Sequence, residues 1–325
     1  MRILFVTASR IGDAVLSTGL LDWLSRTYPG CRITVACGAA AAGLFEAAPN
    51  VERVIPMVKR KRAGHWFDLW RATCGSFWHL VVDLRGSALG WVVPALRRRI
   101  AKSSWEPRHR TVHLGELLGI GPQAPVLWTS AEAEAEAACL IPEGSPVLAL
   151  GPTANWGAKQ WPAERFAVLA RRLTAADGLL PGARVALFGA AGERDSIRAL
   201  IDSLPPERTI DLVGRVSLAV AGACLRRASL YIGNDSGLMH MAAAAGVPTL
   251  GLFGPSSELF YGPCGPKVAS VRGPRSFEDI CHAPDFDHRS TACMMLDLEV
   301  DAVARAAAGL LGKCHPERSD GSFSL

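Results

Sequence analysis

Short apolar runs alternate with longer amphipathic segments along most of the chain. Seven of the runs are brief, rich in β-branched residues and often end in Gly, Asp or Asn, which is typical of strands buried on both faces of a sheet. These runs are RILFV (2–6), RITVAC (32–37), HLVVDL (79–84), VLALG (147–151), RVALFG (184–189), LYIGND (230–235) and PTLGLFG (248–254). Segments such as 163–176 and 217–228 between them have helical periodicity. The alternation predicts an α/β fold, with parallel sheets covered by helices on both faces.

The strand–helix alternation restarts near residue 146, after a helix-forming run that ends in Pro and Gly. We therefore expect an N-terminal domain over residues 1–143 and a C-terminal domain over residues 144–312. This prediction leaves open whether the last helix packs against the N-terminal domain. Residues 313–325 lack periodicity and are predicted to form a disordered tail. A chain of 325 residues is long enough for two domains that each bury a core.

Composition narrows the class of protein. The net charge of +5 is too small an excess to indicate nucleic-acid binding by itself, and the nine cysteines contain no CxxC pair, as in reduced, mostly buried thiols. The N-terminus has no signal-peptide pattern, and no apolar run reaches the roughly 20 residues that a membrane span needs. We expect a cytoplasmic protein, with contact at a membrane surface left open.

The two halves of the chain differ in their aromatic and basic content. All nine tryptophans lie between Trp23 and Trp161, and the densest basic clusters are KRKR (59–62) and RRRIAK (97–102). These features are either ordinary core aromatics with a solvated surface, or a basic, aromatic-rimmed face for a large anionic acceptor.

The segment 231–257, YIGNDSGLMHMAAAAGVPTLGLFGPSS, carries the strongest chemical pattern. Asp235 or Ser236 can cap a helix that follows a strand, and Gly237 lets a ligand approach the exposed N–H groups of its first turn, which form an anion site. Ser236 and His240 are four residues apart and share one helix face. The alternative is a well-capped structural helix with a hydrogen-bonded histidine.

Two polar turns follow other predicted strands. Lys159 lies in the turn after the strand at 147–151, where a lysine can neutralise a leaving diphosphate without a metal, unless it is simply a surface lysine. The turn at Ser9 carries Asp13 at a helix N-terminus, where a carboxylate suits the helix dipole but would repel a phosphate.

Several other motifs are weak. Gly119, Gly121 and Ala124 fit GxGxxA, but Pro122 interrupts them and no strand clearly precedes them. The DFD sequence at 285–287 matches the DxD pattern of metal-dependent sugar transferases, but it lies in a Pro-flanked loop. The spacing of four further side chains matches no standard zinc site. These are Cys281, His282, His288 and Cys293.

Together these segments resemble glycosyltransferase family 9, the bacterial heptosyltransferases of lipopolysaccharide core assembly. The resemblance covers nearly the whole chain, and its last segment is more similar to the heptosyltransferase II type, which adds the second heptose, than to the first. It is carried by RIGDAVLSTGLL (10–21), VVDLRG (81–86), HLGELLGI (113–120), GAKQWP (157–162) and the segment 231–257. It implies a GT-B fold, in which two Rossmann-like domains face each other across a cleft. The N-terminal domain would take the acceptor and the C-terminal domain the ADP-sugar.

The resemblance also implies roles for individual residues. The catalytic base falls on Asp13 and the diphosphate-binding lysine on Lys159, with no metal and no cofactor required. The donor-binding residues are Asn155, Asp235, Ser236, Gly237 and His240. The family often has a glutamate that holds the nucleotide ribose in the helix after LVGR (212–215), but this chain has VSLAVAGAC there, without an acid. That departure puts the ribose contact in doubt.

The function that these observations predict is inverting, metal-independent transfer of a heptose from ADP-heptose to a lipopolysaccharide inner-core acceptor. The predicted contacts to an anionic glycolipid acceptor are Arg60, Lys61, Arg62, Arg97 and Arg98. We expect a monomer that touches the inner membrane peripherally and binds no nucleic acid. The alternatives are transfer of another nucleotide sugar to a surface glycan, a nucleotide-sugar hydrolase or epimerase on the same fold, and a non-catalytic binding protein.

Overall fold

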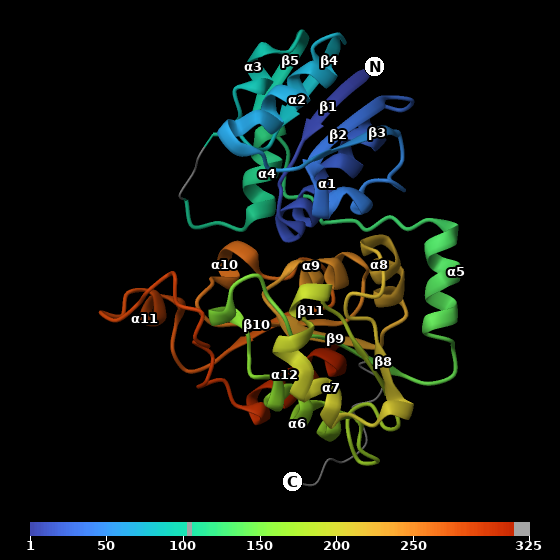
Figure 1. The fold of residues 1–325 in the computed structure, drawn as a ribbon, viewed down its shortest axis with the longest axis vertical. Coiled ribbons are helices and arrows are strands. Elements are labelled where there is room, and N and C mark those ends of the chain that lie inside the picture. The colour runs from blue at the N-terminus through green and yellow to red at the C-terminus, as the bar shows by residue number, and fades with distance from the viewer. Residues whose placement is uncertain (103–105, 315–325) are drawn as a thin grey trace. The chain divides into compact units, whose positions relative to one another are not determined.

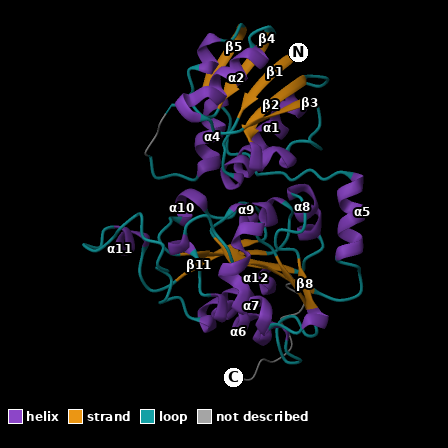
Figure 2. Ribbon diagram, in the orientation of Figure 1, coloured by secondary structure: helices purple, strands orange, loops and turns teal. Residues whose placement is uncertain are grey.

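The computed structural model describes residues 1–102 and 106–314 and divides the chain into two compact units, residues 1–130 and 131–325 (Figure 1). In the described part of each unit a β-sheet is flanked by helices (Figure 2). Every strand pairing in both sheets is parallel, as the buried apolar runs predicted.

The first unit contains a five-stranded sheet in the order β3-β2-β1-β4-β5, a doubly wound arrangement that starts at its centre. Its strands are β1 (Arg2–Val6), β2 (Arg32–Gly38), β3 (Val51–Met57), β4 (Trp78–Asp83) and β5 (Ala95–Ile100). Its α-helices are α1 (Ile11–Thr27), α2 (Gly64–Thr73), α3 (Leu89–Val92) and α4 (Arg110–Leu118). Right-handed crossovers place α1 on one face of such a sheet and the helices that follow β3 and β4 on the other.

The second unit contains a six-stranded sheet in the order β11-β10-β9-β6-β7-β8. Its strands are β6 (Val147–Gly151), β7 (Arg184–Leu187), β8 (Thr209–Asp211), β9 (Leu230–Asn234), β10 (Thr249–Phe253) and β11 (Val268–Arg272). Its longer helices are α5 (Ala131–Leu140), α6 (Ala163–Thr174), α8 (Leu218–Arg226), α9 (Gly237–Ala244) and α12 (Val300–Cys314), and its shorter ones are α7 (Arg198–Ser203), α10 (Glu258–Tyr261) and α11 (Phe277–Cys281).

The last helix, α12, packs within the second unit. Its buried face, which includes Val303, Ala307 and Leu310, joins one core cluster with α6 and the strands of the second sheet. The fully buried Trp161 belongs to this cluster, and its indole N–H donates to the Leu298 carbonyl oxygen at 2.8 Å, just before α12. Each large apolar side chain buried there contributes roughly 2 kcal/mol, which is why α12 stays with this sheet.

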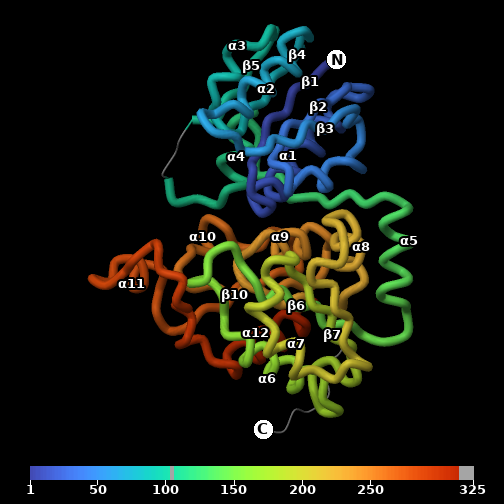
Figure 3. The backbone as a smooth tube through the Cα atoms, in the orientation of Figure 1, coloured from blue at the N-terminus to red at the C-terminus, as the bar shows by residue number. Residues whose placement is uncertain are grey.

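Helix α5 also belongs to the second unit, so the units separate after Ser130 rather than at the expected 143/144 boundary. Ala133 and Ala137 are buried, and Figure 3 shows the backbone of α5 running beside α8. Two arginines at the end of α8 reinforce this contact. Arg226 forms an ion pair with Glu134, and Arg227 donates to the Ile141 carbonyl oxygen at 2.6 Å.

All seven strands predicted from apolar runs are present, and four further strands, β3, β5, β8 and β11, were not predicted. These four form the edges of the two sheets. The predicted tail begins too early, because Lys313 and Cys314 still belong to α12. The rest of that tail, residues 315–325, lies outside the described residues.

Candidate functional site

The loop that carries Lys159 is fixed at both ends by Asn234, the last residue of β9, whose side chain is fully buried. Its Oδ1 accepts a hydrogen bond from the Trp161 backbone N–H at 3.1 Å, and its Nδ2 donates to the Pro152 carbonyl oxygen at 2.8 Å. The loop between β6 and α6 is therefore tied to the carboxyl end of β9. Ligands of parallel α/β sheets bind at this edge.

Within this loop, Lys159 forms an ion pair with Asp235. The lysine Nζ lies 2.5 Å from the aspartate Oδ2, and the two side chains are 21% and 6% exposed. The aspartate holds the ammonium group in place, while its own charge would repel a phosphate. Because an ammonium group has three N–H bonds, the lysine can also donate to a ligand on its solvent side. The pair is neutral overall, and it presents a positioned ammonium group at the sheet edge.

Helix α9 begins beside this pair. Ser236 precedes its first turn with extended backbone (φ −150°, ψ 172°), and its side chain makes no cap hydrogen bond. The Ser236 Oγ is a buried atom without a hydrogen-bond partner among the described residues. The first N–H groups of α9, from Gly237 onward, have no acceptor within the helix, which makes this terminus an anion site. His240 lies one turn further along and is 3% exposed.

The loop after β10 borders the same sheet edge and is held by Arg272. Its guanidinium donates to both carboxylate oxygens of Glu258, at 2.8 and 2.5 Å, and to the carbonyl oxygens of Gly254 and Ser256, at 3.0 and 2.7 Å. The hydrogen bonds from Arg272 hold the pKa of the Glu258 carboxyl below its ordinary value. The loop after β10 is therefore braced by the Arg272 side chain.

Glu193 is a carboxylate that sequence reasoning missed. It lies in a short 3-10 helix (Ala191–Ile197) after β7, and its Oε2 accepts hydrogen bonds from the Thr153 hydroxyl and the Ala190 backbone N–H, both at 2.8 Å. Thr153 belongs to the Lys159 loop, so Glu193 stands at the same sheet edge. The signal that could have found it is the sequence AAGERD directly after the predicted strand RVALFG.

The neighbouring Arg194 anchors this segment. Its two terminal nitrogens donate to the Asp211 carboxylate at the end of β8, at 3.1 and 2.5 Å. Burial raises the pKa of Asp211, but the hydrogen bonds from Arg194 and from the Val213 backbone outweigh it, and the pKa falls below its ordinary value. Glu193 is thus attached to a fixed part of the sheet edge. Asn155, predicted to bind the donor, is exposed in the Lys159 loop.

The first unit has its own polar edge, where Asp13 lies in the first turn of α1, directly after β1. The turn is compact because a Cβ at Gly38 would lie only 2.5 Å from the Ser9 Cα. Arg85, which follows β4, reaches the same turn: its guanidinium donates to the Ser9 hydroxyl at 2.6 Å. The guanidinium also lies 5.1 Å from the centroid of the Trp66 ring, a cation–π contact.

The loop that carries Arg85 is organised by a buried acid. Asp83 is fully buried and accepts hydrogen bonds from the Arg85 backbone N–H and from the backbone N–H and hydroxyl of Ser87, at 2.9, 2.9 and 2.5 Å. The sequence VVDLRG therefore builds a fixed turn that presents a cation near Asp13. Sequence reasoning quoted this motif but did not select Arg85 as a site residue.

The five predicted acceptor-binding cations come from two different elements of the first unit. Arg60, Lys61 and Arg62 follow β3, whereas Arg97 and Arg98 lie in β5 at the opposite edge of the sheet. The segment of Arg60 to Arg62 continues into α2, which packs with β1 and β4, so the two groups of cations reach the site from separate elements.

The individual cations also differ in what they contact. Arg60 pairs with Asp68 at 2.5 Å, and Arg98 donates three hydrogen bonds to the carbonyl oxygens of Gly90, Ala95 and Val93. Arg98 is therefore engaged in bracing the junction between α3 and β5, while Arg97, like Lys61 and Arg62, is exposed.

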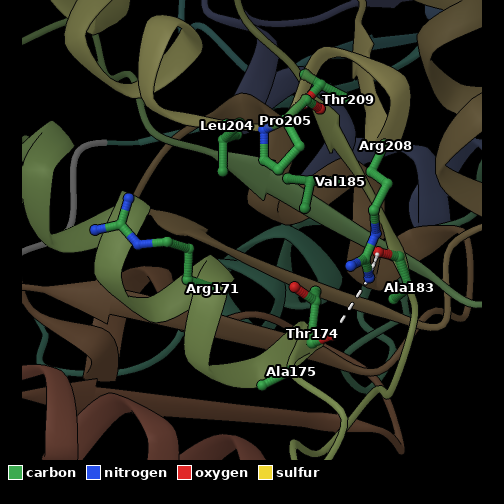
Figure 4. Close-up of a pocket in the computed structure, with 9 residues that line it drawn as sticks. All are labelled: Arg171, Thr174, Ala175, Ala183, Val185, Leu204, Pro205, Arg208 and Thr209. Atoms are coloured by element: carbon green, nitrogen blue, oxygen red, sulfur yellow. Dashed lines mark hydrogen bonds between the residues drawn. The ribbon is translucent and has the colours of Figure 1, made fainter.

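A small pocket of about 130 Å³ lies away from the predicted site. Its lining includes Val185 near the start of β7, Thr174 at the end of α6 and Arg208 before β8 (Figure 4). Arg208 donates to the carbonyl oxygens of Thr174 and Ala183 at 3.3 and 2.9 Å. The pocket thus lies at the amino edge of the second sheet, opposite the edge that carries Lys159.

Metal-binding clusters and membrane-spanning helices were also considered in the sequence. Over residues 1–102 and 106–314, no group of three or more His, Cys, Asp or Glu side chains is arranged to hold a metal ion, and this covers both the DFD loop and the Cys281–Cys293 region. In the same described residues, no helix has the length and apolar character required to cross a membrane.

Comparison with known proteins identifies the family to which this chain is similar. A sequence model described as glycosyltransferase family 9 (heptosyltransferase) matches residues 85–287, more than half of the chain. The lipopolysaccharide heptosyltransferase 2 of Salmonella typhimurium is 28% identical over 313 residues, which cover 84% of this chain and 88% of that protein.

Solved structures agree on the fold. A family 9 glycosyltransferase from Veillonella parvula superposes with a TM-score of 0.79 at 21% identity, covering 95% of this chain and 97% of that one. The E. coli ADP-heptose lipopolysaccharide heptosyltransferase II gives 0.71 at 22% identity, with 96% and 98% covered. The predicted GT-B fold of two Rossmann-like units is confirmed. Through its sequence match and its fold, the chain belongs to glycosyltransferase family 9, the heptosyltransferase family.

Proposed function

We propose that this enzyme transfers a heptose from ADP-heptose to a lipopolysaccharide inner-core acceptor, with inversion and without a metal ion. The observation that carries the proposal is the Lys159–Asp235 ion pair beside the N-terminus of α9, at the ligand-binding edge of a family 9 chain. The names of its relatives supply the sugar and the acceptor: one is a lipopolysaccharide heptosyltransferase 2, and another is an ADP-heptose enzyme.

The donor diphosphate is taken to bind between Lys159 and the first N–H groups of α9, with the buried Ser236 hydroxyl as a further donor. Asp235 contributes by holding the lysine rather than by touching the phosphates. Glu193 and Thr153 supply the polar contact for the ribose that the helix after LVGR lacks, because a carboxylate accepts hydrogen bonds from vicinal hydroxyls. The donor contacts thus need no cation besides the lysine.

In the transfer step, an acceptor hydroxyl oxygen attacks the anomeric carbon from the face opposite the diphosphate. The new carbon–oxygen bond forms as the bond to the diphosphate oxygen breaks, and ADP leaves with that electron pair. Asp13 takes the proton of the acceptor hydroxyl as general base. Lys159 and the α9 amides bind the leaving group more tightly as its charge grows, which lowers the barrier.

The acceptor side is supplied by exposed cations of the first unit. Arg85 is held beside the Asp13 turn by Ser9 and Trp66, so it is the cation best placed to contact a phosphate or carboxylate of the acceptor. Lys61, Arg62 and Arg97 would contact more distant anionic groups of a large glycolipid.

A donor panel tests the proposal. Purified enzyme is incubated with ADP-heptose, other ADP-sugars, UDP-sugars and GDP-sugars, first in a thermal-shift assay and then with a heptosylated core acceptor, with and without EDTA. Of the donors in the panel, we expect only ADP-heptose to stabilise the enzyme and to give product with the acceptor. EDTA should cause no loss of product, and NMR should show an inverted anomeric centre. ADP release at full rate without acceptor would instead indicate a hydrolase.

A further inference from the structure

Large apolar side chains are exposed mainly in one region of the first unit. Of the large hydrophobic residues that are well exposed in the described chain, seven lie between residues 58 and 96. They are Val58 (64%), Phe67 (56%), Trp70 (37%), Phe77 (56%), Trp91 (67%), Val92 (60%) and Leu96 (65%). Large apolar side chains that gather on one surface mark an interaction site, whereas single ones scattered over a surface are ordinary.

Most of these side chains come from elements on one face of the first sheet. Trp66 and Leu69 of α2 and Leu89 of α3 pack into a single core cluster with β1 and β4, so both helices cover that face. The outward sides of α2 and α3 carry Phe67 with Trp70 and Trp91 with Val92. The rings of Phe67 and Trp70 stack with centroids 5.7 Å apart.

The edge strand β5 extends this surface. Arg98 is paired in register with Val81, a member of the same core cluster, and its side chain bonds to α3. Because side chains alternate along a strand, Leu96 projects from the same face as Arg98. We call the exposed side chains Phe67, Trp70, Trp91, Val92 and Leu96 the aromatic face.

The aromatic face lies in the most basic part of the chain. Residues 58–102 contain ten Lys or Arg and only two Asp, a net charge of +8, whereas the whole chain carries +5. The remainder of the chain is therefore net negative. Of the two aspartates, Asp83 is fully buried, and Asp68 is paired with Arg60. Arg71 lies on α2 one turn after Phe67 and is exposed.

We propose that the aromatic face docks the enzyme on the surface of an anionic phospholipid bilayer. Tryptophan and phenylalanine rings settle at the boundary between headgroups and acyl chains, while flanking Lys and Arg side chains are attracted to anionic headgroups. A nucleic-acid partner would not need protruding Leu and Val side chains, and a neutral protein partner would not need the concentrated positive charge. The docking goes beyond the proposed transfer reaction and does not depend on it.

Vesicle flotation with the full-length protein tests the docking. The probes are vesicles of phosphatidylcholine alone and of phosphatidylcholine with 30% phosphatidylglycerol, at 50 mM and 500 mM NaCl. We expect binding to the anionic vesicles only, and weakening at high salt, because the attraction of basic side chains to the surface is screened. Brominated lipids should quench the tryptophan fluorescence of the bound protein.

The variant Phe67→Ser/Trp91→Ser/Leu96→Ser should lower the vesicle partition coefficient by about tenfold or more. It should keep the far-UV spectrum and Tm of the parent, because all three side chains are exposed. A matched control is Val168→Ser/Leu296→Ser, which removes side chains that are 45% and 59% exposed in the second unit. That control should bind as the parent does. Arg71→Glu tests the charge contribution and should also weaken binding.

Three outcomes would overturn the proposal: no binding to anionic vesicles, equal binding by the triple variant and its control, or self-association through this face in sedimentation velocity. Turnover on a delipidated, soluble acceptor separates the docking from the reaction. A triple variant that turns over normally there but does not float supports the docking alone. A parent that floats but transfers no heptose contradicts the proposed function and leaves the docking intact.

Discussion

The two polar sheet edges differ in how firmly their functional side chains are held. In the second unit, Lys159 is paired with a carboxylate that is only 6% exposed, and the fully buried Asn234 fixes its loop. In the first unit, Arg85 beside the Asp13 turn is exposed and is held by one hydroxyl and one aromatic ring. This difference agrees with the proposed roles, a preorganised edge for a small, invariant diphosphate and an open edge for a large acceptor.

Asp13→Asn should have the largest effect on turnover, and it should distinguish most clearly between the proposed roles of the two sheet edges. Loss of the general base should lower kcat by about 10²–10⁴-fold, because proton transfer contributes that much to such steps. Donor affinity, measured by calorimetry with ADP-heptose, should change less than twofold.

The matched control for Asp13 is Asp22→Asn, further along the same helix, where the carboxylate pairs with Arg26. It should keep its turnover. An equal loss of donor affinity in Asp13→Asn would contradict the assignment of the base to the acceptor side.

Lys159→Met should have the second largest effect on turnover. We expect kcat to fall by about 10²–10³-fold, as when one charge-stabilising donor is removed. The buried Asp235 would also lose its partner, which costs about 3 kcal/mol of unfolding free energy.

Adding Asp235→Asn to Lys159→Met distinguishes these two losses. The unfolding temperature of the double variant should return toward that of the parent, since no uncompensated charge remains. Its turnover should stay low. Recovered turnover would show that the lysine serves the fold and not the reaction.

Lys61→Glu/Arg62→Glu probes the open edge and should have a smaller effect. Reversing two exposed charges should raise the acceptor KM about tenfold or more, because each removes a contact of about 1 kcal/mol and adds a repulsion. Steady-state kinetics should show an unchanged donor KM. Arg198→Glu, an exposed arginine of the second unit, serves as the control, and an equal rise in that variant would argue for a nonspecific charge effect.

The smallest effect concerns the Glu258–Arg272 pair behind the donor site. The pKa of Glu258 is lower in the folded chain than its ordinary value of 4.5. The stabilisation is therefore fully present above about pH 4.5 and is lost as the pH falls through the folded pKa. Because the carboxylate is 39% exposed, solvent screening keeps the gain small.

Thermal melts of Glu258→Gln and the parent measure this contribution. At pH 7 the variant should melt about 2 °C lower, and the difference should shrink toward pH 3. A difference that grew on acidification would contradict the sign of the shift.

The seven strands found from the sequence are the interior strands of the two sheets, and the four missed strands are the edges. An interior strand of a parallel sheet is covered on both faces and reads as a continuous apolar run, as VLALG does. The edge strand β5, ALRRRI, is only partly buried and contains three arginines. It therefore does not form an apolar run and could not be found by that pattern. The same search could not see that α5 contacts α8, since that contact joins distant parts of the sequence.

At the candidate site, sequence reasoning selected residues by position after a strand, and this placed Lys159, Asp235 and Ser236 at one sheet edge. It could not show that Lys159 and Asp235 pair, because that bond depends on side-chain geometry across 76 positions of sequence. It missed Glu193 because an acid was sought only in the helix after LVGR, whereas Glu193 lies after β7. The roles given to these residues remain predictions.

The attachment of α5 to the second unit determines where this enzyme can be cut and recombined. A chimera that exchanges second units between relatives should be joined at Ser130/Ala131. A junction at residue 143 would deliver a second unit without Ala133, Ala137 and the Glu134 partner of Arg226, leaving one side of α8 uncovered. Exchange of the second unit as a module thus depends on a helix that the sequence alone would have assigned to the other half.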